Sequence, residues 1–250
     1  MRGFLQMLWQ RFRYRITHTS RFPKGDLISF FVNLADRGFK PRHIVDVGAN
    51  RGKWSREALR IFPDCAFTLI EPQVEMESQL DQFCQRCPNV RWINAGVGAD
   101  IGELEFTVVP DTVSSSFAYP DDVATAAGYE RRIVPVITLD HLVENEIHTV
   151  PDLVKIDAEG FEYNIMQGAQ SLIGKTEVFL LELPLVEVPE GWHSFSELVT
   201  MMADFGYEPY EFTGFIKMKC DSATRLCEIA FARRSGILRG NNQSEVKHAA

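Results

Sequence analysis

The segment from residue 44 to residue 52 constrains the fold more than any other part of this chain, because a short apolar strand runs directly into a glycine-containing turn. Its sequence is IVDVGANRG. Gly48 lets the backbone bend or approach a ligand where a Cβ would clash, and Gly52 permits tight packing of the helix that begins at Lys53. Apolar residues then recur at helical spacing, and Pro63 follows the last turn. Strand, turn and amphipathic helix predict the first half of a Rossmann-like unit.

Two acids accompany this turn. The turn reads Asp-x-Gly-x-x-x-Gly from Asp46 to Gly52, whereas a pyrophosphate loop has the pattern Gly-x-Gly-x-x-Gly. Glu71 ends the next apolar run and lies 19 residues beyond Gly52, close to the offset at which an acid reaches ribose hydroxyls. The two acids therefore indicate an adenosine-type ligand without a pyrophosphate, and S-adenosylmethionine is the ligand that we expect.

Four blocks of sequence follow one another along the chain. They are VDVGANRG with Ser55 beyond it, IEP at residues 70–72, VITLDHL at residues 136–142, and LVKIDAEGFE at residues 153–162. Together they resemble the FkbM family of S-adenosylmethionine-dependent methyltransferases over about residues 40–235. The resemblance implies a class I methyltransferase fold and O-methylation, often of sugar or polyketide hydroxyls. The expected cofactor-binding residues are Asp46, Gly48, Asn50, Gly52, Ser55 and Glu71.

Length and composition agree with a single α/β domain. The chain has 250 residues, 45% of them hydrophobic, which suffices for a sizeable core. Repeated strand–helix units predict a mostly parallel sheet with helices on both faces and an antiparallel closing strand. We expect a basic helical segment in residues 1–40, the methyltransferase domain in residues 41–235, and a tail without regular structure in residues 236–250.

Charge is distributed unevenly along the chain. Residues 1–24 contain six basic and no acidic side chains, whereas the remainder carries 20 basic and 34 acidic ones. Large apolar side chains are interspersed in the first segment, a mixture suited to peripheral contact with an anionic membrane. Docking of this segment on the folded domain is the alternative that we favour, because its apolar residues occupy more than one helix face. The acidic body disfavours a nucleic-acid partner.

The cysteines and the longest apolar runs bear on the cellular compartment. Cys84 and Cys87 form one C-x-x-C pair among five cysteines, and a structural zinc site of this type would need a second pair. They are expected to be ordinary core or surface cysteines in a reducing cytoplasm. No apolar run reaches the length of a membrane span, and no secretory signal precedes the domain.

Ionisable side chains mark the ends of two predicted neighbouring strands. Asp157 and Glu159 follow the strand at residues 153–156, Lys155 shares a face with Asp157, and Glu182 ends the next apolar run. Ligands of open α/β sheets bind beyond the carboxyl ends of the strands. A buried ion pair is the structural alternative, but four such groups beside a cofactor turn favour an active site.

The expected chemistry is modest, because the sulfonium already makes the methyl group electrophilic. The protein must align the acceptor oxygen and accept its proton. Asp157 or Glu159 is the expected base, with Lys155 or Glu182 orienting it and the acceptor. Alternatively, Asp157 and Glu159 bind Mg²⁺, which would lower the pKa of the acceptor hydroxyl.

A long loop is expected between residues 110 and 128, and loops of that length are usually functional or disordered. Ser115, Ser116 and Tyr119 supply hydroxyls and an aromatic face suited to a small-molecule or glycan acceptor. We expect this loop to bind the acceptor independently of the residues that hold the cofactor.

Two other classes of protein remain open. A non-catalytic regulator that binds an adenosine ligand would need the glycine turn and its two acids, but not the group of ionisable residues beyond it. A nicotinamide-dependent oxidoreductase should show the tighter glycine pattern, which this turn lacks. The sequence therefore favours a methyltransferase.

Overall fold

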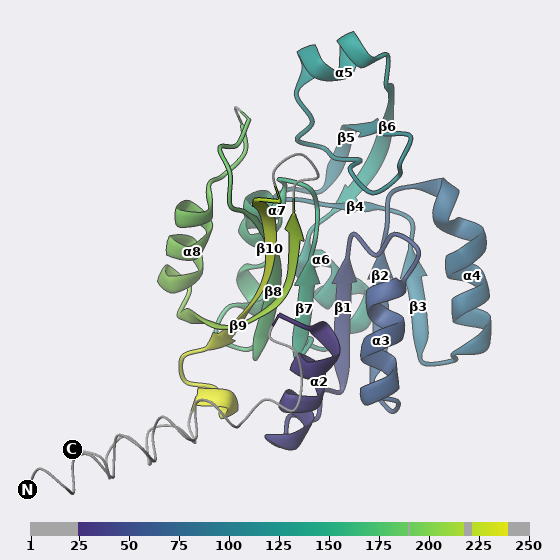
Figure 1. The fold of residues 1–250 in the computed structure, drawn as a ribbon. Helices are drawn as coiled ribbons and strands as arrows, with labels where there is room; N and C mark the ends of the chain where they lie inside the picture. The colour runs from purple at the N-terminus through teal and green to yellow at the C-terminus, as the bar shows by residue number, and fades with distance from the viewer. Residues whose placement is uncertain (1–24, 190, 218–221, 240–250) are drawn as a thin grey trace, which may run out of the picture.

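The computed structural model describes residues 25–189, 191–217 and 222–239. Their main feature is a seven-stranded sheet in the order β3-β2-β1-β7-β8-β10-β9 (Figure 1). The strands are β3 Val90–Ile93, β2 Ala66–Ile70, β1 His43–Val47, β7 Leu153–Ile156, β8 Val178–Pro184, β10 Thr224–Arg233 and β9 Tyr207–Lys217. Neighbours from β3 to β8 are parallel, and β10 is antiparallel to β8 and β9. The predicted Rossmann-like sheet with an antiparallel closing strand is confirmed.

Helices cover both faces of this sheet. One face carries α2 Leu27–Asp36, α3 Lys53–Ile61 and α4 Glu77–Arg86, the last after a 3-10 turn at Val74–Met76. The other face carries α6 Leu139–His141 with the π-helix Leu142–Ile147, α7 Glu162–Gln167 with the 3-10 turn Gln170–Leu172, and α8 Phe195–Asp204.

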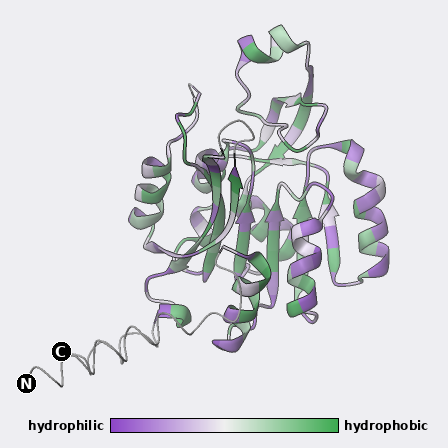
Figure 2. Cartoon of the chain, in the orientation of Figure 1, coloured by the Kyte–Doolittle hydropathy of each residue, from purple (hydrophilic) through white to green (hydrophobic). Residues whose placement is uncertain are grey.

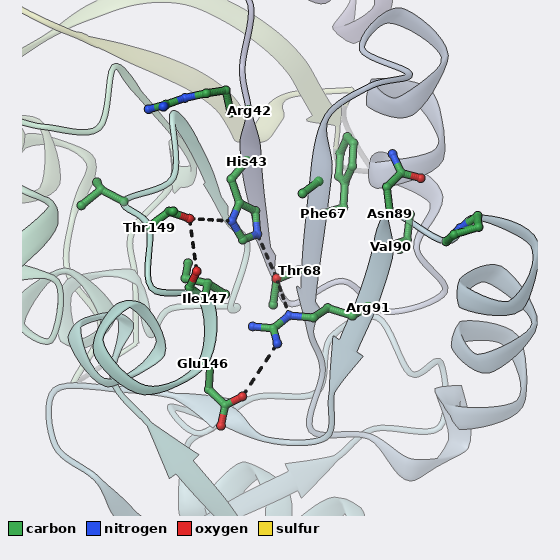
Figure 3. A pocket seen from close by; sticks show the side chains of 13 residues that line it. Arg42, His43, Phe67, Thr68, Asn89, Val90, Arg91, Glu146, Ile147 and Thr149 are labelled. Atoms are coloured by element: carbon green, nitrogen blue, oxygen red, sulfur yellow. Dashed lines mark hydrogen bonds and ion pairs between the residues drawn. The ribbon is translucent and has the colours of Figure 1, made fainter.

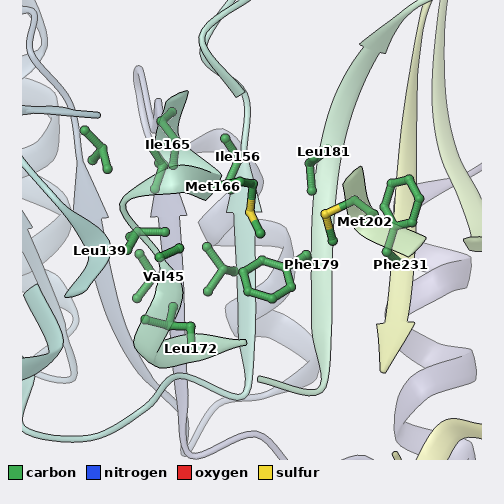
Figure 4. Close-up of a cluster of buried hydrophobic side chains, with 14 of the residues drawn as sticks. Val45, Leu139, Ile156, Ile165, Met166, Leu172, Phe179, Leu181, Met202 and Phe231 are labelled. Carbon is green, nitrogen blue, oxygen red and sulfur yellow. The ribbon is translucent and has the colours of Figure 1, made fainter. Parts of the chain in front are cut away.

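The hydrophobic core follows from the alternation of strand side chains. Ile44 packs with the helices of the first face, and Val45 and Val47 pack with those of the second. Figure 2 shows apolar strands enclosed between helices whose outer sides are polar, and Figure 4 shows the second cluster around Phe179 and Met202. The central strands β1, β7 and β8 are therefore buried on both faces, as is usual for a parallel sheet.

Side chains just before two helices cap their first turns. The Asp26 carboxylate accepts a hydrogen bond from Ser29 N at 2.8 Å at the start of α2. Ser194 and Glu197 form a reciprocal capping box at the start of α8. These caps fix the residues at which the two helices begin.

A second sheet lies beyond the carboxyl edge of the first, at the top of Figure 1. Its strands are β4 Gly96–Val97, β6 Glu130–Ile137 and β5 Gly102–Val108, in that order. Helix α5 Asp121–Ala127 connects β5 to β6, so the loop expected over residues 110–128 is shorter than predicted. Asp121 and Asp122 favour this helix because acidic side chains stabilise a first turn.

The two ends of the chain were assigned as a basic helical segment and a tail. Helix α2 lies within residues 25–40, whereas residues 1–24, with their predicted membrane or docking contact, lie outside the described residues. Leu238 is 2% exposed, and its N–H donates to Glu177 Oε1 at 3.0 Å. Leu238 thus packs on the domain although it lies within the predicted tail, residues 236–250, of which residues 240–250 are not described. Among the described helices, none is both long and apolar enough to span a bilayer.

Candidate active site

The glycine turn after β1 brings the ends of two strands together. Gly48, Asn50 and Gly52 have positive φ angles of 70°, 46° and 69°. A Cβ on Gly48 would lie 1.8 Å from the carbonyl oxygen of Asp157, and one on Gly52 would lie 3.0 Å from the Phe83 ring. The predicted reason for Gly52, close helix packing, is confirmed. Gly48 is needed because the backbone after β7 passes directly beside it.

Glu71 lies at the end of β2 and is 2% exposed. Its carboxylate accepts hydrogen bonds from the N–H groups of Asn50 at 2.7 Å and Gln73 at 2.9 Å. Burial raises the pKa of Glu71, although these N–H donors act in the opposite direction. Glu71 and Asn50 line one cavity together with Gly48, so the acid is fixed beside the turn as the sequence predicted.

Asp46 and Ser55 lie beneath the turn and are 0% exposed. The Ser55 hydroxyl donates to Asp46 Oδ2 at 2.6 Å, and Lys155 Nζ lies 3.3 Å from Asp46 Oδ1. Neither Asp46 nor Ser55 lines the cavity. They hold the turn from below, and their direct contact with a cofactor stays a prediction.

Lys155 connects the buried acid to the open end of the site. Its ammonium donates to Gly48 O at 3.1 Å and lies 3.0 Å from Asp157 Oδ2. Burial lowers the pKa of Lys155, but the charges of Asp157 and Asp46 more than offset this and raise it above its ordinary value. Lys155 therefore remains a cation that orients carboxylates and cannot itself accept a proton.

Three carboxyl groups gather at the carboxyl edge of the sheet. An oxygen from each of Asp157, Glu159 and Glu182 lies within 4.8 Å of the others, so the structure brings together the acids that the sequence grouped. Burial, followed by the charge of Asp157, raises the pKa of Glu159 to about 8 and that of Glu182 to about 10. Close carboxyl groups cannot all ionise in a low-dielectric site. Glu159 and Glu182 therefore stay mostly protonated at neutral pH.

Sequence reasoning missed one further acid in this row. Glu228 on β10 pairs in register with Glu182 on β8, and it accepts a hydrogen bond from the Thr213 hydroxyl at 2.5 Å. Burial raises the pKa of Glu228 to about 7. The available signal was a single acid inside the apolar run of residues 226–232, but its partner strand could not be known from the sequence.

Of the three residues expected to bind the acceptor, Ser115 lines the cavity beside Glu71, whereas Ser116 and Tyr119 do not. Ser116 Oγ donates to the carbonyl oxygen of Glu159 at 2.7 Å, and Ser115 Oγ accepts from Val109 N at 2.9 Å. Tyr119 packs edge-on against Tyr129, with ring centroids 5.6 Å apart, and does not line the cavity. The two serine hydroxyls are therefore engaged within the protein, and Tyr119 lies apart from the acids.

Residues 109–118, which we call the strap, lie across the cavity that Gly48, Asn50 and Glu71 line. The carbonyl oxygen of Thr112 accepts from Asn50 Nδ2 at 2.7 Å and from Gln73 Nε2 at 3.0 Å. Both donors belong to residues that bind Glu71 through their N–H groups. The strap is thus hydrogen-bonded to two residues beside Glu71, from which we expected it to be separate.

The ring of Phe117 fills much of the space under the strap. A Cβ on Gly96 would lie 2.3 Å from it, and its centroid lies 4.8 Å from that of Phe106 and 5.4 Å from that of Phe161. The cavity that remains measures about 80 Å³, far below the roughly 300–1,000 Å³ of ordinary ligand pockets. Phe117 therefore restricts the space beside Glu71 and Glu159.

A second cavity lies at the opposite edge of the sheet, where β1, β2 and β3 begin (Figure 3). His43 is 9% exposed in its wall, with Nε2 2.9 Å from the Thr68 hydroxyl, which also accepts from Arg91 Nε at 3.0 Å. Burial lowers the pKa of His43 to about 4, so its ring is neutral at physiological pH. This network stabilises the strand starts and lies away from the acids.

Comparison with protein families gives one match over the site. The model of the methyltransferase FkbM domain matches residues 46–209, which include the glycine turn, Glu71 and the three clustered acids. A search of curated protein sequences finds no match.

Solved structures with a similar fold include several methyltransferases. A methyltransferase FkbM from Methylobacillus flagellatus KT is 15% identical, with a TM-score of 0.48 over 76% of this chain and 44% of that one. The chain thus spans less than half the length of that protein. The O-methyltransferase TomG from Streptomyces achromogenes is 13% identical, with a TM-score of 0.48 over 82% of this chain and 78% of that one. A precorrin-6y C5,15-methyltransferase from Geobacter metallireducens GS-15 is 13% identical, with a TM-score of 0.44 over 81% and 86%.

Proposed function

This chain belongs to the FkbM family of methyltransferases, and we propose that it transfers a methyl group from S-adenosylmethionine to a hydroxyl of a sugar, a glycan or a related metabolite. Dependence on S-adenosylmethionine follows from the family. The acceptor class and the roles of individual residues are the proposed part.

The carboxyl cluster beside the glycine turn is the observation that carries this proposal. A hydroxyl acceptor needs a group that takes its proton, and general bases work best when their pKa lies near the working pH. Burial beside Asp157 gives Glu159 a pKa of about 8. Glu159 is therefore the proposed base, with Asp157 held by Lys155 at 3.0 Å and Glu182 as its neighbour.

The reaction balances with these groups alone. The acceptor oxygen attacks the methyl carbon, the new O–C bond forms as the S–C bond breaks, and the electron pair of that bond stays on sulfur. Glu159 takes the hydroxyl proton as the bond forms. The products are the methyl ether, S-adenosylhomocysteine and a protonated Glu159.

The donor site is proposed to lie under the strap. Gly48, Asn50 and Gly52 shape the backbone there, and Glu71 is placed to accept hydrogen bonds from ribose hydroxyls. Asp46 and Ser55 support this site from below through the 2.6 Å hydrogen bond between them.

Methyl transfer to material from the source cells tests the acceptor class. The probe is the polysaccharide fraction of cells that lack the intact gene, incubated with purified protein and S-adenosylmethionine labelled in its methyl group. We expect label in released sugars and a mass increase of one CH₂ group. Label found only in protein or nucleic acid would overturn the acceptor class. Donor binding without transfer to any fraction would favour the non-catalytic regulator.

A divalent cation is the alternative chemistry for the same acids. Asp157, Glu159 and Glu182 could offer three oxygens to Mg²⁺, which would lower the pKa of the acceptor hydroxyl. We expect instead that activity survives exhaustive EDTA treatment, because Lys155 already neutralises Asp157. Loss of transfer with EDTA and its recovery with Mg²⁺ would assign the metal role.

A further inference from the structure

The backbone that carries Glu159 adopts an unusual conformation. Glu159 has a φ of 49° and Gly160 a φ of 96°, and the left-handed region is disfavoured for a side chain such as glutamate. Such conformations persist only where the surroundings hold them, and they gather at functional sites. The Glu162 carboxylate holds one side of this bend by accepting from Ala158 N at 2.9 Å.

Trp192 covers the other side of the bend. It lies in the loop between β8 and α8, and its indole ring packs so closely on Gly160 that a Cβ there would lie 2.3 Å from the ring. Its indole N–H donates to the carbonyl oxygen of Ala118, in the strap, at 2.6 Å. Trp192 belongs to neither hydrophobic cluster of the domain, so its packing serves this corner rather than the core.

The strap closes the arrangement from the third direction. Ser116 Oγ donates to the carbonyl oxygen of Glu159 at 2.7 Å and accepts from Ala118 N at 2.9 Å. Three loops from separate parts of the chain thus meet at Glu159 and Gly160, and Trp192 is the side chain that touches both of the others. Losing it would free the bend and the strap together.

We propose that Trp192 is a positioning residue that holds Glu159 in the left-handed conformation and so keeps its carboxyl group within the acid cluster. The proposal rests on the function proposed above, in which Glu159 is the base. Gly160 is then required because the indole ring occupies the space of any Cβ.

Amide hydrogen exchange in the full-length protein tests whether Trp192 holds the bend at Glu159 and Gly160, and it needs no acceptor. Trp192→Ala should speed exchange in residues 157–162 by about tenfold or more, because exchange reports local opening. Trp192→Phe keeps a ring over Gly160 but loses the donor to Ala118, so its effect should be smaller. Trp92→Phe is the matched control. It removes a 2.7 Å hydrogen bond from the indole of Trp92, on β3, to Asp81, and it should leave the exchange of residues 157–162 unchanged. Parental exchange in Trp192→Ala would overturn the proposal.

Single-turnover methyl transfer to the polysaccharide probe tests the functional half. Trp192→Ala alone should slow transfer by about tenfold or more, because misplacing a catalytic group by a small distance is costly. In a Glu159→Gln background it should add no further loss, since the group that it positions is already gone. If the rate loss of the double variant equals the product of the two single losses, Trp192 acts by another route and the positioning role is overturned. A parental rate in Glu159→Gln alone would instead refute the base assignment, while exchange still decides whether Trp192 holds the bend.

Discussion

At the scale of single residues, Lys155 decides how charge is arranged in the site. Its ammonium lies between Asp46 and Asp157, at 3.3 and 3.0 Å, and it also bonds the carbonyl oxygen of Gly48. One buried cation therefore fixes the turn, the buried acid and one member of the carboxyl cluster. The remaining acids have no comparable partner in the described part of the chain, and burial raises the pKa values of Glu159 and Glu182 for that reason.

The pKa of Glu159 makes methyl transfer pH-dependent. A base works only when deprotonated, so with a pKa of about 8 the rate should rise with pH through that value and then level off. Initial rates on the polysaccharide probe between pH 6 and pH 9.5 measure this. Glu159→Gln should abolish the rise along with most of the activity. A flat profile in the parental protein would assign the base elsewhere.

Glu71 should matter for the donor rather than for the chemistry. Glu71→Gln is expected to weaken S-adenosylmethionine binding by about 1.5–3 kcal/mol, the range for a hydrogen bond to a charged group. Calorimetry on both proteins measures it. Glu77→Gln, at an exposed position in the first turn of α4, is the matched control and should bind as the parent does. Equal affinity in Glu71→Gln would remove this acid from the donor site.

At the scale of elements, the strap couples the two halves of the site. It bonds the cofactor side through Thr112 and the acid side through Ser116, and its Phe117 ring fills the cavity between them. Deleting residues 112–122 should therefore weaken donor binding as well as transfer. This coupling could not be predicted, because the sequence of a loop does not say which strand ends the loop crosses.

Phe117 should slow entry of the donor. Phe117→Ala removes the ring that occupies the cavity, so S-adenosylmethionine should associate several-fold faster in stopped-flow fluorescence, since lid opening can limit binding. The donor-free protein should lose about 1–3 kcal/mol of stability, less than for a fully buried Phe→Ala change, because the side chain is only half-buried. An unchanged association rate would mean that the strap already opens freely.

At the scale of the whole molecule, buried acids make stability depend on pH. Glu159 and Glu182 have folded pKa values of about 8 and about 10, raised by burial, so the folded state binds more protons than the unfolded state near neutral pH. Stability therefore falls as pH rises from about 7 to 8.5. Melting temperatures across this range measure the slope, which Glu182→Gln should make shallower. Glu75→Gln is the control, because its Arg132 hydrogen bond lowers the pKa of Glu75, which titrates below this range.

Much of the fold could be read from local pattern. The strand at residues 153–156, the cap at Asp26 and the capping box of Ser194 depend on a few neighbouring residues, whose spacing and side-chain chemistry are sufficient to specify them. The parallel order followed from repeated strand–helix units. The acids at the carboxyl edge followed too, because parallel strands must end on the same side of a sheet.

What only the tertiary structure decided concerns contacts between distant parts of the chain. The pairing of Glu182 with Glu228, the second sheet and the crossing of the strap over Glu71 all join segments far apart in sequence. The same is true of Trp192 on Gly160. The local conformational preferences of a segment do not depend on which distant residues it contacts. Such contacts are selected by packing of the whole chain. Packing also determines whether a polar side chain, chosen as a site residue by its chemistry, faces a ligand or supports the residues that line the site.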